Sequence, residues 1–192
     1  MIYIIFPKRL FDFIIALFAT IILGLFMLLV AILVKFTSPG PILYWSQRVG
    51  RNNIIFEMPK FRTMLINTPA VATHLLDDPG RYLTPVGGFL RKSSLDELPQ
   101  LWSILTGDMS IVGPRPALFN QDDLIELRTL KGIHKLSPGL TGWAQINGRD
   151  ELPIPVKVEL DEYYVNNCSF RLDMKIIFLT FVKVVKSEGV IH

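Results

Sequence analysis

The stretch from Phe13 to Val34 constrains the fold of this chain more than any other. It contains 22 residues without a charge, which is long enough for an α-helix to cross the hydrocarbon core of a bilayer. A cleaved signal peptide has a shorter apolar region that ends in small residues, whereas this stretch continues into Lys35 and Phe36. The sequence therefore predicts a retained, membrane-embedded helix within residues 1–36.

Basic residues flank this helix on both sides. Lys8 and Arg9 precede it, and the residues that follow include Lys35, Arg48, Arg51, Lys60 and Arg62. Positive charges concentrate on the cytoplasmic side of a membrane, so an asymmetric pattern would identify one cytoplasmic end. The symmetric pattern instead favours a helix that enters and leaves the membrane on the same face, and a helix that spans the membrane stays open as the alternative.

The composition agrees with a membrane protein of one domain. Of its 192 residues, 50% are hydrophobic and only 19% are charged, below the roughly 25% that is usual for soluble domains. Cys168 is the single cysteine, which excludes an internal disulfide and a cysteine zinc cluster. The formal charge of +3 argues only weakly for an acidic partner, and the chain has no P-loop, dinucleotide-binding glycine pattern or nucleophile elbow.

We expect residues 37–192 to form one small α+β domain. Asn52 and Asn53 are typical of a hairpin tip, between strands at about 46–50 and 54–58. Four apolar residues recur at helical spacing and predict one face of a helix near 98–105: Leu98, Leu101, Trp102 and Leu105. The other expected elements are a long loop with a short helix at 67–88, a turn or loop at 138–143, and helices at 122–130, 156–164 and 170–186.

The last of these helices is basic on one side. At 100° per residue, four basic side chains fall within about 120° of one another: Arg171, Lys175, Lys183 and Lys186. Most of the remaining positions are apolar, which suits a helix that lies in a membrane surface. A core helix with a solvated lysine face is the alternative, and the membrane helix at the other end of the chain favours the interface.

Asp96 and Glu97 lie side by side just before Pro99, in the sequence SSLDELPQL. Proline fits only the first turn of a helix, so Asp96 is a natural N-cap and Glu97 falls in that turn. A capping box from Ser94 to Glu97 is the alternative. Both interpretations place two carboxylates at the positive end of a helix, where acidic residues are favoured for structural reasons alone.

Nearby cations make a chemical role worth weighing. Arg91 and Lys92 precede the carboxylates, and Arg115 follows them between two prolines that fix its backbone, as suits bidentate phosphate binding. Lys60 and Arg62 alternate as on one side of a strand. The structural alternatives are that Arg115 pairs with Asp108 and that Lys60 and Arg62 are exposed strand residues.

A polar segment follows the loop at 138–143. It contains Gln145, Asn147 and Arg149, which are plausible contacts for a sugar or a nucleotide. The pattern is not specific by itself, because similar polar turns are common in loops.

Six motifs, in order from about residue 8 to residue 186, together resemble the bacterial sugar transferase family, in its short monotopic form. They are Lys8-Arg9-Leu10-Phe11-Asp12, Lys60-Phe61-Arg62-Thr63-Met64, Ser94-Leu95-Asp96-Glu97-Leu98-Pro99-Gln100-Leu101, Gly107-Asp108-Met109-Ser110, Gly113-Pro114-Arg115-Pro116 and the segment 138–149. The resemblance covers nearly the whole chain.

This resemblance implies a phosphoglycosyl transferase, which moves a sugar 1-phosphate from a UDP-sugar to polyprenyl phosphate and releases UMP in membrane glycan assembly. It implies that Asp96 is the nucleophile that forms a covalent intermediate. It also implies that Glu97 binds Mg²⁺, with Asp96 as a second candidate ligand. The residues that it implies for stabilising the phosphates are Lys60, Arg91 and Arg115. Gln145, Asn147 and Arg149 become candidate substrate contacts.

The resemblance also implies a location on the cytoplasmic face of the bacterial inner membrane. Membrane lipids are the expected partners, nucleic acid is not, and a homodimer stays open as an oligomeric state. A noncatalytic scaffold that binds anionic lipids, and a transferase in which the lipid attacks directly, are the alternatives. Short family members have a Ser-Pro break in a re-entrant membrane helix, whereas this chain has Gly24-Leu25 there and no proline. Glycine weakens a helix without forcing a kink, so the re-entrant topology is an expectation.

Overall fold

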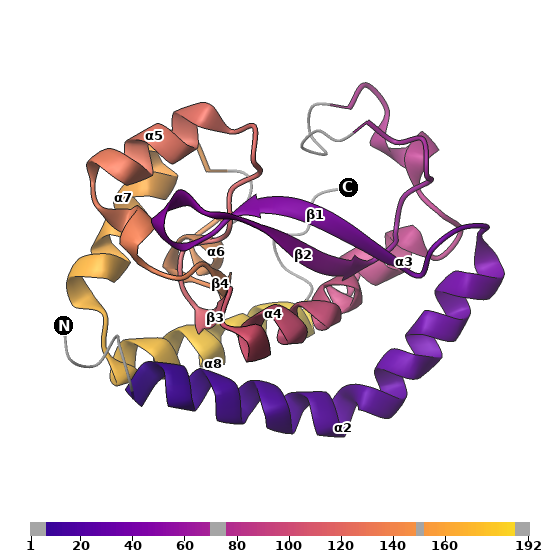
Figure 1. Ribbon diagram of the computed structural model, residues 1–192, viewed down its shortest axis with the longest axis horizontal. Coiled ribbons are helices and arrows are strands. Elements are labelled where there is room, and N and C mark those ends of the chain that lie inside the picture. The colour runs from indigo at the N-terminus through magenta and orange to yellow at the C-terminus, as the bar shows by residue number, and fades with distance from the viewer. Residues whose placement is uncertain (1–6, 70–75, 149–151, 187–192) are drawn as a thin grey trace.

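The computed structural model describes residues 7–69, 76–148 and 152–186, and it confirms an α+β fold with a long apolar helix (Figure 1). The helices are α2 (Pro7–Thr37), α3 (Gly87–Lys92), α4 (Leu101–Thr106), α5 (Asp122–Leu130), α6 (Trp143–Ile146), α7 (Ile154–Asn167) and α8 (Phe170–Lys186). The strands are β1 (Leu43–Val49), β2 (Ile55–Phe61), β3 (Ser110–Val112) and β4 (Gly139–Thr141). Short 3₁₀ turns are η1 (Arg51–Asn53), η3 (Pro79–Tyr82), η4 (Leu95–Gln100) and η5 (Ile133–Lys135).

The expected hairpin is present and is longer than predicted. β1 and β2 pair antiparallel from Leu43 opposite Phe61 to Val49 opposite Ile55. Asn52 and Asn53 form the tip with positive φ angles of 55° and 60°, a conformation that asparagine tolerates better than most residues. β2 continues past Pro59 because both strands of a two-stranded sheet have a free edge, where the missing N–H of proline is acceptable.

The segment 138–143, predicted as a turn or loop, contains a strand. β4 pairs in parallel with β3, with Ser110 beside Gly139 and Val112 beside Thr141. The two backbones approach so closely that a Cβ on Gly139 would lie 2.1 Å from the backbone N of Gly113. Glycine is required for this approach. The prediction was wrong because the partner strand is far away in the sequence, where local turn signals carry no information about it.

Helix α2 contacts the rest of the protein at both of its ends. Ala16 belongs to a core cluster with α4, β3 and α8, whereas Val30 and Val34 belong to a second cluster with Phe61 and Leu90. The segment between these contacts is exposed or half-buried, and only 11% of the most apolar window, with a mean hydropathy of 3.0, is buried in the protein. Figure 1 shows that α2 bends between a first part beside α8 and a second part that rises to the hairpin.

This arrangement favours the re-entrant topology over a spanning one. A helix that spans a bilayer carries its two ends to opposite faces, about 30 Å apart. Here one domain binds both ends of the helix.

A buried polar cluster fixes the beginning of α2. Lys8 Nζ lies 2.7 Å from Asp173 Oδ2 of α8, and Asp173 also accepts a hydrogen bond of 2.8 Å from the Tyr164 hydroxyl of α7. Asp12 accepts hydrogen bonds from the Ser110 hydroxyl at 2.7 Å and from the next backbone N–H of β3. The cluster therefore joins the first helix, the last helix and β3, and its polar groups satisfy one another as burial requires.

Two arginines bind backbone carbonyls near the ends of α2. Arg9 donates to the carbonyls of Ile104 and Leu105 at the end of α4, where a cation complements the unsatisfied carbonyls of a helix. Arg62 is buried and donates to three carbonyls just after α2, those of Ser38, Pro39 and Pro41. The alternative that Arg62 is an exposed strand residue is therefore wrong, because its guanidinium donates to three carbonyls of the loop that follows α2.

Helix α8 has the predicted bounds and presents a mixed face to the outside. Asp173 and Ile176 are fully buried against the domain, whereas Phe178 and Phe181 are 65% and 67% exposed, with Arg171 and Lys175 also exposed. A face that is merely solvated seldom carries two large exposed aromatic side chains. The pattern favours the membrane surface, where basic and aromatic residues occur together. Lys183 is half-buried, and the Lys186 side chain lies outside the described residues.

We predict that Lys8→Met strongly destabilises the protein. The substitution leaves Asp12 and Asp173 buried without their shared cation, which costs about 3 to 5 kcal/mol for a broken buried pair. Thermal unfolding in detergent measures the effect. Lys35→Met is the matched control near the other end of α2, because Lys35 is exposed and only reaches the Gly40 carbonyl at 3.5 Å. An equal unfolding temperature for both variants would contradict the role of the cluster.

Candidate active site

The two neighbouring carboxylates lie in η4, a 3₁₀ turn that leads directly into α4. Asp96 is not the N-cap that was expected: Ser94 occupies that position, with a left-handed φ of 56° and no capping hydrogen bond from its side chain. The left-handed residue turns the chain sharply after α3, so the helical turn begins before Asp96. The capping box is also absent, although both carboxylates do lie in the first turn.

The helix predicted near 98–105 is thus split into η4 and α4. Leu101 is buried, as expected, and Leu98 and Leu105 pack against the two core clusters. Trp102 is 59% exposed, so its assignment to the buried face was wrong. A 3₁₀ turn has three residues per turn rather than 3.6, and this changes which side chains share a face.

Glu97 is held by two cations from distant parts of the chain. Its Oε1 atom lies 2.8 Å from Lys60 Nζ of β2 and 2.9 Å from Arg115 Nη2, which follows β3. Burial opposes ionisation of Glu97, but Arg115 and Lys60 together hold its pKa well below the ordinary range. Glu97 is therefore a permanent anion that fixes both cations beside it.

Asp96 has the opposite character. It is only 6% exposed, and within the part of the chain that the structure describes no donor forms a hydrogen bond with its carboxylate. Burial raises its pKa to about 6. The nearby Lys60 opposes this shift, the charge of Glu97 adds to it, and Arg91 and Arg115 oppose it. Asp96 is thus ionised at neutral pH, yet its oxygens are not engaged by hydrogen-bond donors.

Three predicted cations converge on this pair. Lys60 arrives on β2, Arg91 on α3 and Arg115 on the turn after β3, and all three act on the charge of Asp96. The alternative that Arg115 pairs with Asp108 is wrong, because Asp108 accepts a 2.7 Å hydrogen bond from the Thr106 hydroxyl instead. The alternative of an exposed Lys60 is also wrong, since its side chain is 16% exposed and reaches Glu97.

The predicted polar contacts in segment 138–149 lie elsewhere. Gln145 is buried and donates to the Leu140 carbonyl at 3.0 Å, and Asn147 donates to the Trp143 carbonyl at 2.8 Å. Across the described ranges, neither side chain bonds to the carboxylate pair. Arg149 lies outside the described residues. The segment does support Arg115, because a Cβ on Gly142 would lie 2.1 Å from the Gly113 carbonyl oxygen.

Sequence reasoning missed Gln100, which is 2% exposed and lies one turn after Asp96. Its Nε2 atom is buried and has no partner among the described residues. A buried amide donor that nothing satisfies is uncommon in proteins. The available signal was a polar residue within an apolar helical pattern, between Pro99 and Leu101.

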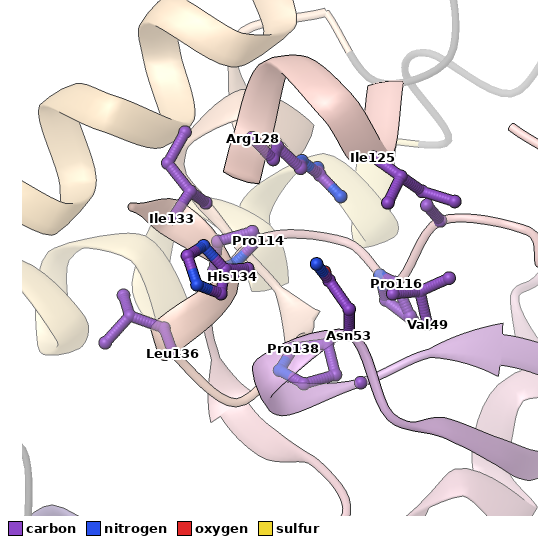
Figure 2. A pocket seen from close by; sticks show the side chains of 12 residues that line it. Val49, Asn53, Pro114, Pro116, Ile125, Arg128, Ile133, His134, Leu136 and Pro138 are labelled. Atoms are coloured by element: carbon purple, nitrogen blue, oxygen red, sulfur yellow. The ribbon is translucent and has the colours of Figure 1, made fainter. Parts of the chain in front are cut away.

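Two cavities are lined by residues other than the carboxylates. One, of about 250 Å³, is lined by residues that include Lys8, Arg9 and Cys168. The other is about 30 Å³ and is lined by residues that include Arg128, His134 and Pro114 (Figure 2). Neither is lined by Asp96 or Glu97. Burial raises the pKa of the Cys168 thiol, which lowers its thiolate fraction at neutral pH.

The donor set is compatible with Mg²⁺. Among the described residues no group of three or more histidine, cysteine, aspartate or glutamate side chains could hold a metal. Mg²⁺ commonly binds through one or two carboxylates together with substrate phosphates and water. Asp96 has both oxygens available and Glu97 has one that is not engaged by Lys60 or Arg115, so the pair fits a metal that arrives with a phosphate substrate.

We predict that Asp96→Asn stabilises the folded protein at alkaline pH. A folded-state pKa of about 6, against the ordinary 3.8, means that the ionised carboxylate opposes folding above pH 6, and that this penalty disappears below pH 4. The variant should gain roughly 1 to 3 kcal/mol at pH 8. Its advantage should shrink as the pH falls to 5. Chemical unfolding at both pH values measures this, and equal stability of both proteins at every pH would contradict it.

Comparisons with known proteins identify the family. The bacterial sugar transferase family matches residues 3–187. The uncharacterized sugar transferase EpsL of Bacillus subtilis is 43% identical over 185 residues, which cover 95% of this chain and 89% of that protein. The exopolysaccharide production protein ExoY of Sinorhizobium fredii is 41% identical, with coverage of 95% and 87%.

A longer relative has a name that states a reaction. The UDP-glucose:undecaprenyl-phosphate glucose-1-phosphate transferase of Escherichia coli is 40% identical over 187 residues, which cover 92% of this chain and 39% of that protein. Together with the profile match over nearly the whole chain, these relatives show that the chain belongs to the bacterial sugar transferase family of enzymes.

Proposed function

We propose that this enzyme transfers a sugar 1-phosphate from a UDP-sugar to undecaprenyl phosphate, releases UMP and so begins the assembly of a glycan. The observation that carries the proposal is a contrast between the two carboxylates. Asp96 is buried and accepts no hydrogen bond from the residues that the structure describes, whereas Glu97 is held by Lys60 and Arg115. Relatives are named for undecaprenyl-phosphate reactions with glucose 1-phosphate, N-acetylgalactosamine phosphate and galactose phosphate. Because these sugars differ, the donor sugar of this chain is left to experiment.

The carboxylate of Asp96 is suited to act as the nucleophile. Its oxygen attacks the phosphorus that carries the sugar, a new O–P bond forms, and the bond to the bridging oxygen breaks as UMP leaves. A phosphate oxygen of the lipid then attacks the same phosphorus and releases Asp96. Since Asp96 is ionised at neutral pH, the first step needs no general base.

The surrounding cations reduce the repulsion between this anion and the diphosphate. The charges of Lys60, Arg91 and Arg115 each lower the pKa of Asp96, and positive groups fixed in advance stabilise charge that develops during transfer. Mg²⁺, held by Glu97 and Asp96, would supply further neutralisation of the diphosphate. Glu97 itself keeps Lys60 and Arg115 in place before the substrate arrives.

The proposed arrangement in the membrane lets both substrates reach this site. In this arrangement α2 enters and leaves the cytoplasmic face of the bacterial inner membrane, and the exposed face of α8 lies in the headgroup region. Its support is the largely exposed apolar surface of α2 and the exposed Phe178 and Phe181 of α8. The phosphate of a polyprenyl lipid resides at that level, and a UDP-sugar arrives from the cytoplasm. One face of one membrane is therefore sufficient for the reaction.

We expect purified enzyme with Mg²⁺ and undecaprenyl phosphate to release UMP from one or a few members of a panel of UDP-sugars. Asp96→Asn should lower the rate by about 10³-fold or more, because it removes the nucleophile. Asp108→Asn is the matched control, since Asp108 is an exposed carboxylate that bonds to Thr106. A folded protein that releases no UMP from any donor would instead support a lipid-binding scaffold.

The same protein distinguishes the covalent route from direct attack by the lipid. Labelled UMP should exchange into the UDP-sugar in the absence of lipid, because a covalent intermediate returns its phosphosugar to UMP. Turnover with lipid but no exchange without it would exclude the covalent intermediate.

We also predict a loss of activity below pH 6. Asp96 must be ionised to attack, and burial places its pKa at about 6, so single-turnover UMP release without lipid should fall about tenfold per pH unit below that value. A UDP-sugar is the right probe because it lacks the terminal phosphate group that titrates near pH 6. A rate that stays constant down to pH 4.5 would exclude Asp96 as the group that must ionise.

A further inference from the structure

The chain from Pro114 to Ala117 has no regular secondary structure, yet each of its four carbonyls accepts a hydrogen bond. The donors come from β4, α5 and β1. They are the Gly139 N–H at 2.9 Å to Pro114, Arg128 Nη1 at 2.8 Å to Arg115, Arg48 Nη1 at 3.2 Å to Pro116, and the Val49 N–H at 3.0 Å to Ala117. Pro114 and Pro116 also fix their own φ angles. This segment is therefore held as firmly as a strand, but by side chains as well as backbone.

Arg128 is the donor that acts on Arg115 itself. It reaches from α5 toward the chain between Pro114 and Pro116 (Figure 2). Its other edge binds Asp161 of α7, with Nε at 3.0 Å and Nη2 at 2.6 Å from Asp161 Oδ2. Arg128 and Asp161 are only 8% and 1% exposed. The carboxylate thus orients the guanidinium, which leaves Nη1 directed at the Arg115 carbonyl.

A purely structural link between α5 and α7 does not need this arrangement. Lys131 and Glu162 already form an exposed ion pair between the end of α5 and α7. A buried pair is expensive to desolvate, and only the planar fork of arginine can bind a carboxylate and a carbonyl in fixed directions at once. The Arg115 side chain binds Glu97. The hydrogen bond to the Arg115 carbonyl fixes the backbone of that residue, and the backbone in turn sets the direction in which its side chain leaves the chain.

We propose that Arg128, oriented by Asp161, is a positioning residue that aims the Arg115 guanidinium at the phosphate-binding site. This inference rests on the proposed function and deepens it. Arg128 touches neither Asp96 nor Glu97 by a hydrogen bond in the described chain, and it acts on them through Arg115. A lysine in its place keeps the positive charge but cannot bind the Asp161 carboxylate and the Arg115 carbonyl in the same fixed directions.

A double-mutant cycle in the complete, membrane-bound enzyme tests this. Arg128→Lys should lower kcat/KM for the UDP-sugar by about tenfold to a hundredfold, as is usual when a supporting residue is lost. In an Arg115→Ala background the same substitution should change kcat/KM less than about twofold, because its effect passes through the missing side chain. Glu162→Gln, which breaks the exposed pair between α5 and α7, should leave kcat/KM unchanged. Losses that multiply in the double variant would overturn the proposal.

A second measurement does not depend on the reaction. Hydrogen–deuterium exchange over residues 113–118 should accelerate several-fold in Arg128→Lys and in Asp161→Asn, but not in Glu162→Gln. Unchanged exchange in a folded Arg128→Lys variant would overturn the positioning role. If the wild type releases no UMP while exchange responds as expected, the proposed function fails and the anchoring of Arg115 stands.

Discussion

The buried cluster of Lys8, Asp12 and Asp173 is the interaction on which the rest of the structure depends. Through Asp173 it joins the first and last helices, and through Asp12 it holds the beginning of β3. β3 leads within a few residues to Arg115, one of the two cations that bind Glu97. At the other end of α2, Arg62 binds carbonyls of the chain that leaves the helix. Arg62 itself comes directly after β2, the strand that carries Lys60. Both ends of the membrane helix are therefore tied to elements that form the site.

This linkage has a physical reason. A membrane helix whose middle is embedded in lipid gains little from packing against a protein, because lipid tails are as apolar as its own side chains. Its position relative to the domain is fixed at its ends, where Ala16, Val30 and Val34 pack into the apolar clusters and polar contacts add direction. Arg9 and Asp12 supply such contacts at the beginning of α2, and Arg62 supplies them just after its end.

The two neighbouring carboxylates have different proposed roles because their surroundings differ. Glu97 forms ion pairs with two cations, which makes its carboxylate less nucleophilic and holds both cations in place. Asp96, one residue earlier, is buried and accepts no hydrogen bond within the described ranges, so its lone pairs stay available there. A buried anion without hydrogen bonds destabilises a fold, which is the kind of strain that functional sites retain. The proposed positioning of Arg115 by Arg128 and Asp161 serves the same site, because a cation stabilises a phosphate group only when it is correctly oriented toward it.

The sequence by itself determined the long apolar helix, the hairpin, the bounds of α5 and α8 and the neighbouring carboxylates with their candidate cations, but not the places of Gln145 and Asn147. These depend on local signals: an uncharged stretch, an Asn-Asn tip, a helical period, and carboxylates and cations in short motifs. It was wrong about the N-cap at Asp96, the exposure of Trp102 and the loop that contains β4. In each case the outcome depends on a left-handed residue, a 3₁₀ turn or a partner strand that local patterns do not encode.

Only the tertiary structure decided which charges meet. Lys60, Glu97 and Arg115 are separated by 37 and 18 residues along the chain, so nothing in their spacing could show that one carboxylate oxygen binds both cations. The same holds for Arg128, which looks like an ordinary helical arginine in the sequence, and for Asp161, one acid among several in α7. Charge interactions depend on distance and burial, and those quantities exist only once the chain has folded.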